Sequence, residues 1–292
     1  ACVDKKFGTG CVKVTPAHDL NDLEMAERNS LQILNIMNDN GTLNEHVPEQ
    51  FQGLDRFDAR KKIVNKLQSL NLIDKIEEYT HKVGFSERTD VVVEPRLSKQ
   101  WFLKMDKLVK PALNAVEKGD VKFYPDRWKK IYNHWLNNIK DWCISRQLIW
   151  GHQIPVWYKG DKIYCGEECP EEEGWIQDGD ILDTWFSSWI WPLATLGWPK
   201  ETNDLKHFYP SQDLVTGPDI IFFWVARMIM SGLYFKKDIP FSNVYFTSII
   251  RDSQGRKMSK SLGNSPDPLD LFDKYGVDAV RVSILMIAPQ GA

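Results

Sequence analysis

Residues 243–250 have the sequence Asn243-Val244-Tyr245-Phe246-Thr247-Ser248-Ile249-Ile250, an apolar run that predicts a buried β-strand. Further along the chain, a helical pattern begins at Pro268 and ends at Gly276. From about residue 180 onward, apolar strands alternate with long amphipathic helices in this way. Such alternation predicts an α/β fold with a parallel sheet, and open sheets of this kind hold nucleotides where a strand turns into the following helix.

The loop between this strand and this helix carries two lysines three residues apart. Its sequence is Lys257-Met258-Ser259-Lys260-Ser261, and it lies between Gly255 and Gly263. Two ammonium groups on a loop that glycine leaves free to move are suited to binding phosphate. A charged loop is by default a solvated surface, however, so the lysine spacing alone leaves a plain basic loop as the alternative.

A second turn from strand to helix follows the short apolar strand Leu214-Val215-Thr216. Gly217 permits a tight turn, and Pro218 suits the first helical position ahead of Asp219. A carboxylate at this place can accept hydrogen bonds from a ribose diol, because such turns face the ligand in α/β sheets. It can equally cap the helix. The residues alone leave both roles of Asp219 open.

Size and charge limit the class of protein. With 292 residues, 42% of them apolar, the chain can bury sizeable cores, and its length favours about two domains. Its net charge of −3 argues against a broad basic surface, so any contact with nucleic acid is expected to be local. The five cysteines are too few and too irregularly spaced for a disulfide framework, which favours a reducing, cytoplasmic setting.

The most apolar stretch of the chain runs from Ile220 to Phe235. We expect it to be too short to span a bilayer, and Arg227 interrupts it. No charged and then apolar leader is present, so a soluble protein without a membrane partner is expected. The chain begins without methionine and stops directly after an apolar run, which suggests an excised part of a longer protein.

Other local patterns predict further elements. A helix led by Asp58 is expected, and Val91-Val92-Val93 predicts a short strand. A hairpin is expected around Gly160. Another helix is predicted to begin at Pro125, and its apolar stripe is expected to pack in the core. That stripe comprises Trp128, Ile131, Trp135, Ile139 and Trp142.

Several of these segments resemble a known family. Residues 250–264, Ile250-Arg251-Asp252-Ser253-Gln254-Gly255-Arg256-Lys257-Met258-Ser259-Lys260-Ser261-Leu262-Gly263-Asn264, are similar to the second signature of the class I aminoacyl-tRNA synthetases. Residues 145–155 also resemble a class I segment. Residues 183–188, Asp183-Thr184-Trp185-Phe186-Ser187-Ser188, and residues 221–228 resemble the valyl family more closely than the isoleucyl and leucyl families. The resemblance runs from about residue 7 to the end of the chain.

This resemblance implies three segments in an α/β fold. Residues 180–292 would form the second half of a Rossmann-type, parallel-sheet catalytic domain. Residues 1–90 would form the C-terminal part of an α/β editing domain, and residues 91–179 would return the chain to the catalytic domain. The implied reactions are ATP-dependent adenylation of valine, its transfer to tRNA-Val, and hydrolysis of mischarged threonyl-tRNA-Val. The implied ligands are valine, tRNA-Val and ATP with Mg²⁺, and a monomer is favoured.

Roles follow residue by residue from the same resemblance. Catalysis would fall to Lys257, Ser259 and Lys260. The residues in contact with ATP and the adenylate would be Gly217, Asp219, Lys257, Met258, Ser259, Lys260 and Ser261. The valine pocket would be lined by Trp185, Ile220 and Trp224, whose two indole faces narrow the space to an isopropyl group. The editing residues would be Lys13, Thr15, Asp19 and Asp22.

Simpler interpretations stand beside these roles. Most of the twelve tryptophans must be core residues, and the segment that holds Asp19 and Asp22 is also typical of a capped helix with an acidic first turn. Arg146 could meet a phosphate or a carboxylate, and His152 is expected to be structural.

Two parts of the family pattern are missing. No two of the six histidines are three residues apart, as the first class I signature requires, so we expect the isolated chain to be inactive in aminoacylation. Ser86 and Thr89 stand where some relatives have cysteines, and Cys165 and Cys169 lack two further donors, so zinc is not expected. Two alternatives to a valyl-family fragment stay open. The chain could be part of an isoleucyl-tRNA synthetase, or it could be a noncatalytic fragment that binds nucleic acid or another partner.

Overall fold

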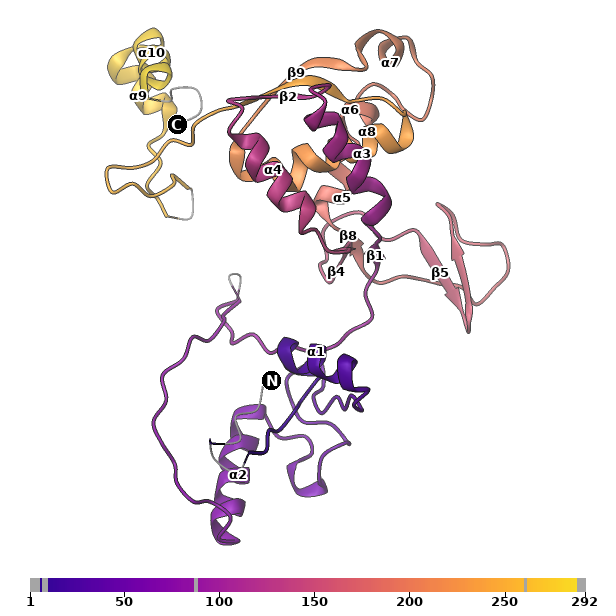
Figure 1. The fold of residues 1–292 in the computed structure, drawn as a ribbon, viewed down its shortest axis with the longest axis vertical. Coiled ribbons are helices and arrows are strands. Elements are labelled where there is room, and N and C mark those ends of the chain that lie inside the picture. Colours follow the sequence, from indigo (N-terminus) through magenta and orange to yellow (C-terminus); the bar gives the residue numbers. More distant parts are fainter. Residues whose placement is uncertain (1–5, 7–9, 87–88, 260–261, 288–292) are drawn as a thin grey trace. The chain divides into compact units, whose positions relative to one another are not determined.

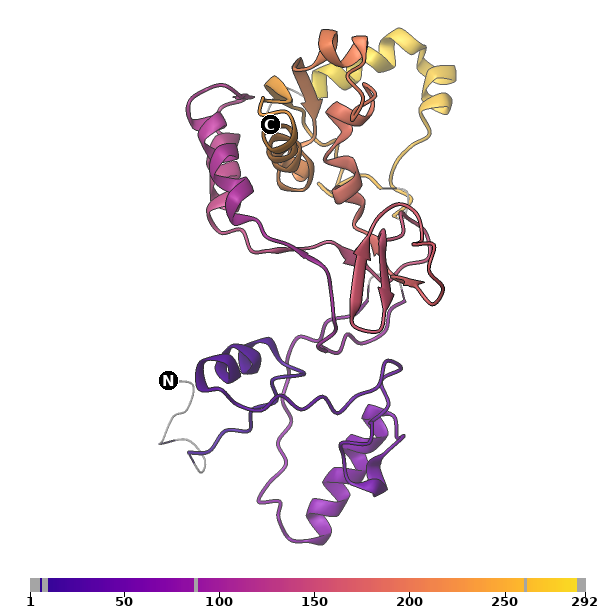
Figure 2. The same ribbon diagram turned by 90° about the vertical axis from the view of Figure 1, so that its right-hand side faces the viewer.

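The computed structural model describes residue 6 and residues 10–86, 89–259 and 262–287. Figures 1 and 2 show the chain from two sides. The chain divides into two compact units, residues 1–99 and 100–292, which are described separately below. The division falls slightly beyond residue 90, where the first segment was expected to end. Residues 100–179 share a unit with the C-terminal segment, because one of their strands completes its parallel sheet.

The N-terminal unit is built from short helices and irregular segments. Its helices are α1 (Leu20–Asn29), η1 (Glu49–Phe51) and α2 (Arg56–Ser69). A small core forms around Met37, Leu43 and Ala59. The side chain of Asp55 caps α2 by accepting from the amide of Phe57, so the helix begins before Asp58, where it was expected to start. The predicted strand at residues 91–93 is reduced to a bridge between Phe85 and Val92.

A three-stranded parallel sheet organises the C-terminal unit. Its strands are β2 (Lys122–Tyr124), β9 (Ser211–Thr216) and β10 (Phe241–Phe246), in the order β2-β10-β9. Val244 in the central strand pairs with Phe123 on one side and Leu214 on the other. The predicted parallel sheet is therefore confirmed. The strand predicted at residues 243–250 is confirmed in part, because β10 begins at Phe241 and ends at Phe246.

Helices pack against this sheet and form the main core. They are α3 (Asp106–Glu117), α4 (Trp128–Asn137) and α8 (Arg227–Phe235). Phe246 is fully buried, and its ring meets that of Phe123 edge to face at 5.4 Å. Phe123 in turn meets Tyr132 of α4 edge to face at 5.2 Å. The hydroxyl of Tyr132 donates to the carbonyl of Ala112 in α3 over 3.0 Å, so the helices are joined by a buried polar contact as well.

The predicted tryptophan stripe is only partly correct. Helix α4 ends at Asn137, and Trp142 lies in the separate strand β3 (Trp142–Cys143). On the helix, Tyr132 and Leu136 are buried, whereas Ile131 and Trp135 are 40% and 48% exposed. Of the stripe, Trp142 is buried in the core, and Trp128 and Ile139 are partly buried and pack against it.

The C-terminal unit also contains short antiparallel strands between residues 102 and 182. They are β1 (Phe102–Leu103), paired with β3; β4 (Ser145–Arg146), paired with β8 (Ile181–Leu182); and β5 (Val156–Lys159), paired with β6 (Lys162–Cys165) and β7 (Ile176–Gln177). The hairpin of β5 and β6 turns at Gly160, whose φ of 56° suits glycine, as predicted.

Further α-helices lie in the second half of the chain. They are α5 (Thr184–Ser188), α6 (Trp191–Ala194), α7 (Asn203–Phe208), α9 (Pro268–Tyr275) and α10 (Val277–Ile287). Helix α9 begins and ends where the sequence predicts: Asp267 caps its start, and Gly276 with a φ of 84° ends it.

The apolar stretch between β9 and β10 is a continuous helical run from Pro218 to Phe235. It consists of η2 (Pro218–Ile220), a 3₁₀ turn, η3 (Ile221–Ala226), a π-helix, and α8. The run is long and apolar enough to cross a membrane, contrary to the expectation that it is too short. Half of it is buried inside the fold, as in the core helix of a folded domain.

We expect Phe246→Ala to lower the free energy of unfolding by about 3–5 kcal/mol, because it removes a fully buried ring at the centre of the parallel sheet. Ile163→Ala in the exposed strand β6 serves as the control and should change it by about 0.5 kcal/mol or less. Urea denaturation measures both. Equal losses would show that the sheet is not the centre of the core.

Candidate functional site

Two segments emerge from the same edge of the sheet, because β9 and β10 are parallel and in register. Thr216, the last residue of β9, pairs with Phe246, the last residue of β10. The amide of Thr247 then donates to the carbonyl of Thr216 over 3.0 Å, so the two segments stay together beyond the strands. The turn at Gly217 follows β9, and the lysine loop follows β10. This edge is where α/β sheets bind ligands.

The lysine loop begins as a small folded unit. Arg251 and Lys257 form an antiparallel bridge, and the amide of Gly255 donates to the carbonyl of Asp252 over 2.9 Å. Gly255 has a φ of 76°, a conformation that favours glycine. The loop therefore doubles back on itself ahead of its lysines. Lys260 and Ser261, which the sequence assigns to nucleotide binding, lie outside the described residues.

Lys257 and Asp219 bring the two predicted motifs together. The Nζ atom of Lys257 lies 2.6 Å from Oδ2 of Asp219, across 38 positions of sequence. Both side chains are exposed, so the pair is open to solvent and to a ligand. Asp219 is the second residue of η2, and Gly217 occupies the capping position. The carboxylate thus faces the lysine loop.

Gly217 allows this arrangement because it has no side chain. A Cβ atom at this position would lie 2.6 Å from Oδ1 of Asp219, closer than real contacts permit. Met258 and Ser259 complete the described part of the loop. The Ser259 amide donates to Oδ1 of Asn264 over 2.9 Å, and its hydroxyl accepts from the amide of Leu262.

The three predicted pocket residues lie on α5 and at the start of the long helical run. Trp185 of α5 stacks on Phe223 of η3, with ring centroids 5.8 Å apart. Trp224 donates from its indole nitrogen to the carbonyl of Ser188 over 3.1 Å. These two contacts join α5 to η3. Ile220 is half-buried at the junction of η2 and η3.

A buried carboxylate holds the start of α5. Asp183 is only 5% exposed and accepts from the amide of Trp185 over 2.7 Å and from the indole of Trp142 over 3.2 Å. It also pairs with the guanidinium of Arg146. Arg146 therefore meets a carboxylate inside the protein. Asp183 thus caps the helix that carries Trp185.

Arg227 lies beside this network and is 6% exposed. Its guanidinium carbon is 3.5 Å from the ring centroid of Trp142, and its Nη1 atom is buried without a hydrogen-bond partner among the described residues. Burial lowers the pKa of Arg227 to about 10, and Asp183 opposes that change. The guanidinium stays charged at neutral pH, so Trp142 carries a cation on its face.

In the N-terminal unit, the four predicted editing residues lie close together. The amide and hydroxyl of Thr15 donate to Oδ2 of Asp22 over 2.7 and 3.1 Å. Lys13 Nζ donates to the Thr15 hydroxyl over 3.3 Å. Asp19 caps α1, as the simpler interpretation predicts, by accepting from the amides of Asn21 and Asp22. Asp22 is more than an acidic residue in the first turn, because it anchors Thr15.

His18 is a structural residue of this cluster that the sequence analysis did not identify. Its Nε2 atom accepts from the amide of Ile36 over 3.2 Å, so the proton must be on Nδ1, which lies 3.1 Å from the carbonyl of Pro95. The imidazole therefore ties the segment before α1 to two distant parts of the unit. In the sequence, the one signal for this role is that His18 directly precedes the capping residue Asp19.

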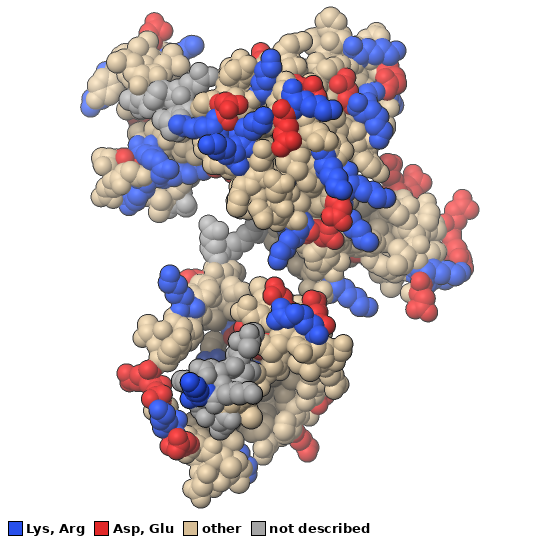
Figure 3. Space-filling model, viewed as in Figure 1, with Lys and Arg blue, Asp and Glu red and all other residues tan. Residues whose placement is uncertain are grey.

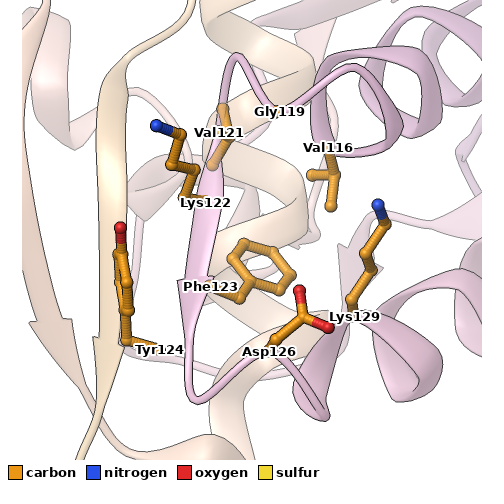
Figure 4. Close-up of a pocket in the computed structure, with 8 residues that line it drawn as sticks. All are labelled: Val116, Gly119, Val121, Lys122, Phe123, Tyr124, Asp126 and Lys129. Atoms are coloured by element: carbon orange, nitrogen blue, oxygen red, sulfur yellow. The ribbon is translucent and has the colours of Figure 1, made fainter.

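Two cavities lie away from these residues. One, of about 230 Å³, is lined by Lys122, Lys129 and Asp126 among others, and Figure 4 shows the ring of Phe123 between the lysines. The other, of about 520 Å³ in the N-terminal unit, lies beside Phe57 and Phe85. The sequence did not predict either of them.

The surface in view carries charges of both signs. Lys and Arg are interspersed with Asp and Glu on the face in Figure 3, which fits a nearly balanced net charge. Within the part of the chain that the structure describes, no group of three or more His, Cys, Asp and Glu side chains could hold a metal ion. Cys165 and Cys169 are exposed. That zinc does not bind stays a prediction.

Comparisons with known proteins agree along nearly the whole chain. A family model described as tRNA synthetases class I (I, L, M and V) matches residues 12–174 and 169–292. Over 99% of its length, the chain is 56% identical to the valine–tRNA ligase of Chlorobaculum tepidum and 53% identical to that of Thermotoga maritima. It spans 33% and 34% of those proteins, about a third of their length.

A solved structure shows the same fold. It is the Mycobacterium tuberculosis methionyl-tRNA synthetase in complex with methionyl-adenylate, with a TM-score of 0.55 and 21% sequence identity. The alignment covers 72% of this chain and 37% of that one. The expected α/β fold with the second half of a Rossmann-type sheet is thereby confirmed.

We expect Asp183→Ala to lower the free energy of unfolding by about 3 kcal/mol, because it leaves Arg146 without its paired carboxylate and α5 without its cap and removes the negative charge near Arg227. Arg146 is partly exposed, which keeps the loss at the lower end for a buried pair. The control is Thr184→Ala at the exposed neighbouring position. Denaturant unfolding measures both, and similar values for the two variants would contradict a buried anchor.

Proposed function

Because the chain belongs to the class I tRNA synthetase family, we propose that it forms about a third of a valine–tRNA ligase. The complete protein adenylates valine with ATP and transfers it to tRNA-Val. The likeness to valine–tRNA ligases over nearly the whole chain supports valine over isoleucine. The methionyl-adenylate in the solved relative supports an aminoacyl-adenylate as the ligand of this fold. A cytoplasmic, monomeric enzyme is part of the proposal.

The contact between Lys257 and Asp219 carries the proposal for the adenylation site. It joins the lysine loop to the strand-to-helix turn at the ligand-binding edge of the sheet. In adenylation, a carboxylate oxygen of valine attacks the α-phosphorus of ATP, and the bond to the departing pyrophosphate breaks. The catalyst for such a step is mainly fixed positive charge. Lys257 and Lys260 supply that charge, and Ser259 adds a hydroxyl.

Nucleotide binding changes the partner of Asp219. In the structure its carboxylate accepts from Lys257, whereas a bound ribose would offer two hydroxyl donors in its place. The released Lys257 then turns to the phosphates of ATP, which enters with Mg²⁺ as part of the substrate. Gly217 leaves room for the ribose, and contact with the phosphates is assigned to Met258, Ser259, Lys260 and Ser261.

Valine selection rests on Trp185, Ile220 and Trp224. The contacts that join α5 to η3 fix both indoles, and rigid walls discriminate by volume against a side chain with one more methylene. Such a pocket rejects threonine only weakly, because threonine and valine have nearly the same shape. A second, hydrolytic site is therefore required for accuracy.

The cluster around Thr15 supplies that second site. Both hydrogen bonds from Thr15 go to Oδ2 of Asp22, which leaves Oδ1 to receive the ammonium group of a mischarged amino acid. Lys13 and Thr15 meet the hydroxyl and the ester of a threonyl group, and Asp19 orients the terminal adenosine. An oriented water then attacks the ester carbonyl, and threonine leaves the tRNA.

In the full-length protein, we expect Lys257→Ala and Lys260→Ala each to slow valine-dependent ATP–pyrophosphate exchange by about a hundredfold or more, with little change in the KM for valine. Lys274→Ala on α9 is the matched control. If KM and kcat worsen together, the lysines bind the ground state and have no special role in the transition state.

The same assay separates the rival functions. A part of an isoleucyl enzyme would support exchange with isoleucine in preference to valine. A noncatalytic fragment that binds nucleic acid or another partner would support exchange with neither, even in the full-length protein. Exchange with valine in the full-length protein is the result that the proposal requires.

For editing, we expect Asp22→Ala in the full-length protein to let threonyl-tRNA-Val accumulate, while charging with valine continues at its normal rate. The reason is that the variant loses the ammonium-binding carboxylate and the anchor of Thr15 together. Glu24→Ala, on the exposed part of the same helix, should leave editing intact. Deacylation of preformed threonyl-tRNA-Val measures the effect, and rapid deacylation by Asp22→Ala would refute the assignment.

A further inference from the structure

The side chain of Asp252 accepts four hydrogen bonds within the lysine loop. Its Oδ1 accepts from the amides of Gln254 and Arg256 over 3.0 and 2.8 Å. Its Oδ2 accepts from Arg256 Nε over 2.8 Å and from Asn264 Nδ2 over 2.9 Å. The side chain is only 11% exposed. These four bonds fold residues 252–256 into one rigid turn.

Asn264 approaches the same turn from the far end of the loop. Its Nδ2 group donates to Asp252 and, over 3.3 Å, to the carbonyl of Lys257, while its Oδ1 accepts from the amide of Ser259 over 2.9 Å. One amide group thus contacts three points of the loop. We call Asp252 and Asn264 together the loop clamp.

The loop clamp lies immediately behind the reactive end of Lys257. The backbone carbonyl of Lys257 is held by Asn264, and its side chain reaches Asp219 at 2.6 Å. Gly255 and Gly263, both with positive φ, place little restriction on the loop themselves. Order in this segment must come from side chains, and the loop clamp supplies it.

We propose that Asp252 and Asn264 are positioning residues for adenylation, which hold the loop in the shape that presents Lys257 at the edge of the sheet. This inference rests on the proposed function of the loop. A positive charge stabilises the departing pyrophosphate best when its position is fixed before the reaction. A lysine side chain that is not held in place must be ordered during the reaction, and this raises the barrier. The loop clamp provides that order without touching ATP or valine.

The electrostatic setting supports the same role. Hydrogen bonds from Asn264 and from Arg256 lower the pKa of Asp252, so its carboxylate is ionised at neutral pH. Among the described residues 250–259, the cations are Arg251, Arg256 and Lys257. Arg251 donates to the carbonyl of Gly255, Arg256 pairs with Asp252, and Lys257 turns to Asp219. Only Lys257 among these three is directed at the ligand-binding edge.

The test is an exchange of the two side chains in the full-length protein. Asp252→Asn places an amide opposite Asn264, and Asn264→Asp places a second carboxylate opposite Asp252. The double variant Asp252→Asn/Asn264→Asp restores one donor and one acceptor, and the carboxylate that it introduces at position 264 can still accept from the amide of Ser259. Asp273→Asn, an exposed change on α9, is the control.

We expect each single change to lower the kcat of valine-dependent ATP–pyrophosphate exchange by about tenfold or more, with the KM for valine unchanged. The double variant should recover part of the lost rate, which is the signature of direct coupling. Recovery is incomplete because the carbonyl of Lys257 loses its donor and Arg256 Nε loses its acceptor. Amide hydrogen exchange at residues 254–259 should rise in the single variants and fall again in the double variant. A purely structural role would instead lower the thermal midpoint and leave the rate per folded molecule unchanged.

Three outcomes would overturn the inference. Wild-type rates in both single variants would show that the loop needs no clamp. Losses that simply multiply in the double variant would show that the two side chains act separately. A wild-type protein without valine-dependent exchange would remove the proposed function, and with it any positioning role in that reaction. The first two outcomes leave the proposed function standing, so the failures can be told apart.

Discussion

The parallel ladder between β9 and β10 is the constraint on which the C-terminal unit depends. Its register sets Thr216 beside Phe246, so the two segments that carry Asp219 and Lys257 leave the sheet together. A slip of one residue would turn the buried Val244 and Phe246 to the opposite face, which the core does not allow. The contact between the two motifs is therefore a product of core packing, and neither loop could establish it alone.

Elements with a local chemical signal were predictable from the sequence. The hairpin at Gly160, the cap at Asp19 and the limits of α9 each depend on neighbouring residues. Elements that depend on partners far along the chain could not be predicted from the sequence. Strand β2 is only three residues long and owes its place to pairing with β10, more than a hundred residues later. The prediction of one helix for the whole tryptophan stripe was wrong. The residue spacing typical of a helix continues past Asn137, but the backbone hydrogen bonds of α4 end there.

The candidate sites divide in the same way. The lysines, aspartates and tryptophans to which we assign a direct chemical role could be named from the sequence, mainly through its resemblance to the family. The side chains that hold them could not, because their partners are backbone amides or residues far along the chain. Asp183 meets Trp142 across 41 positions, and Asn264 meets Asp252 across 12. Neither residue differs in type from an ordinary cap or turn residue, so only the folded structure distinguishes them.

Strand β9 has one neighbour, β10, within the described residues, and so it stands at a margin of the sheet. Its Val215 is 65% exposed. The outward row of amide and carbonyl groups beside an apolar side chain is a ready template for strand addition. Prepared by itself at high concentration, this polypeptide would tend to self-associate through that margin. Aggregation through this strand would then limit the concentration at which the polypeptide can be crystallised or studied by spectroscopy.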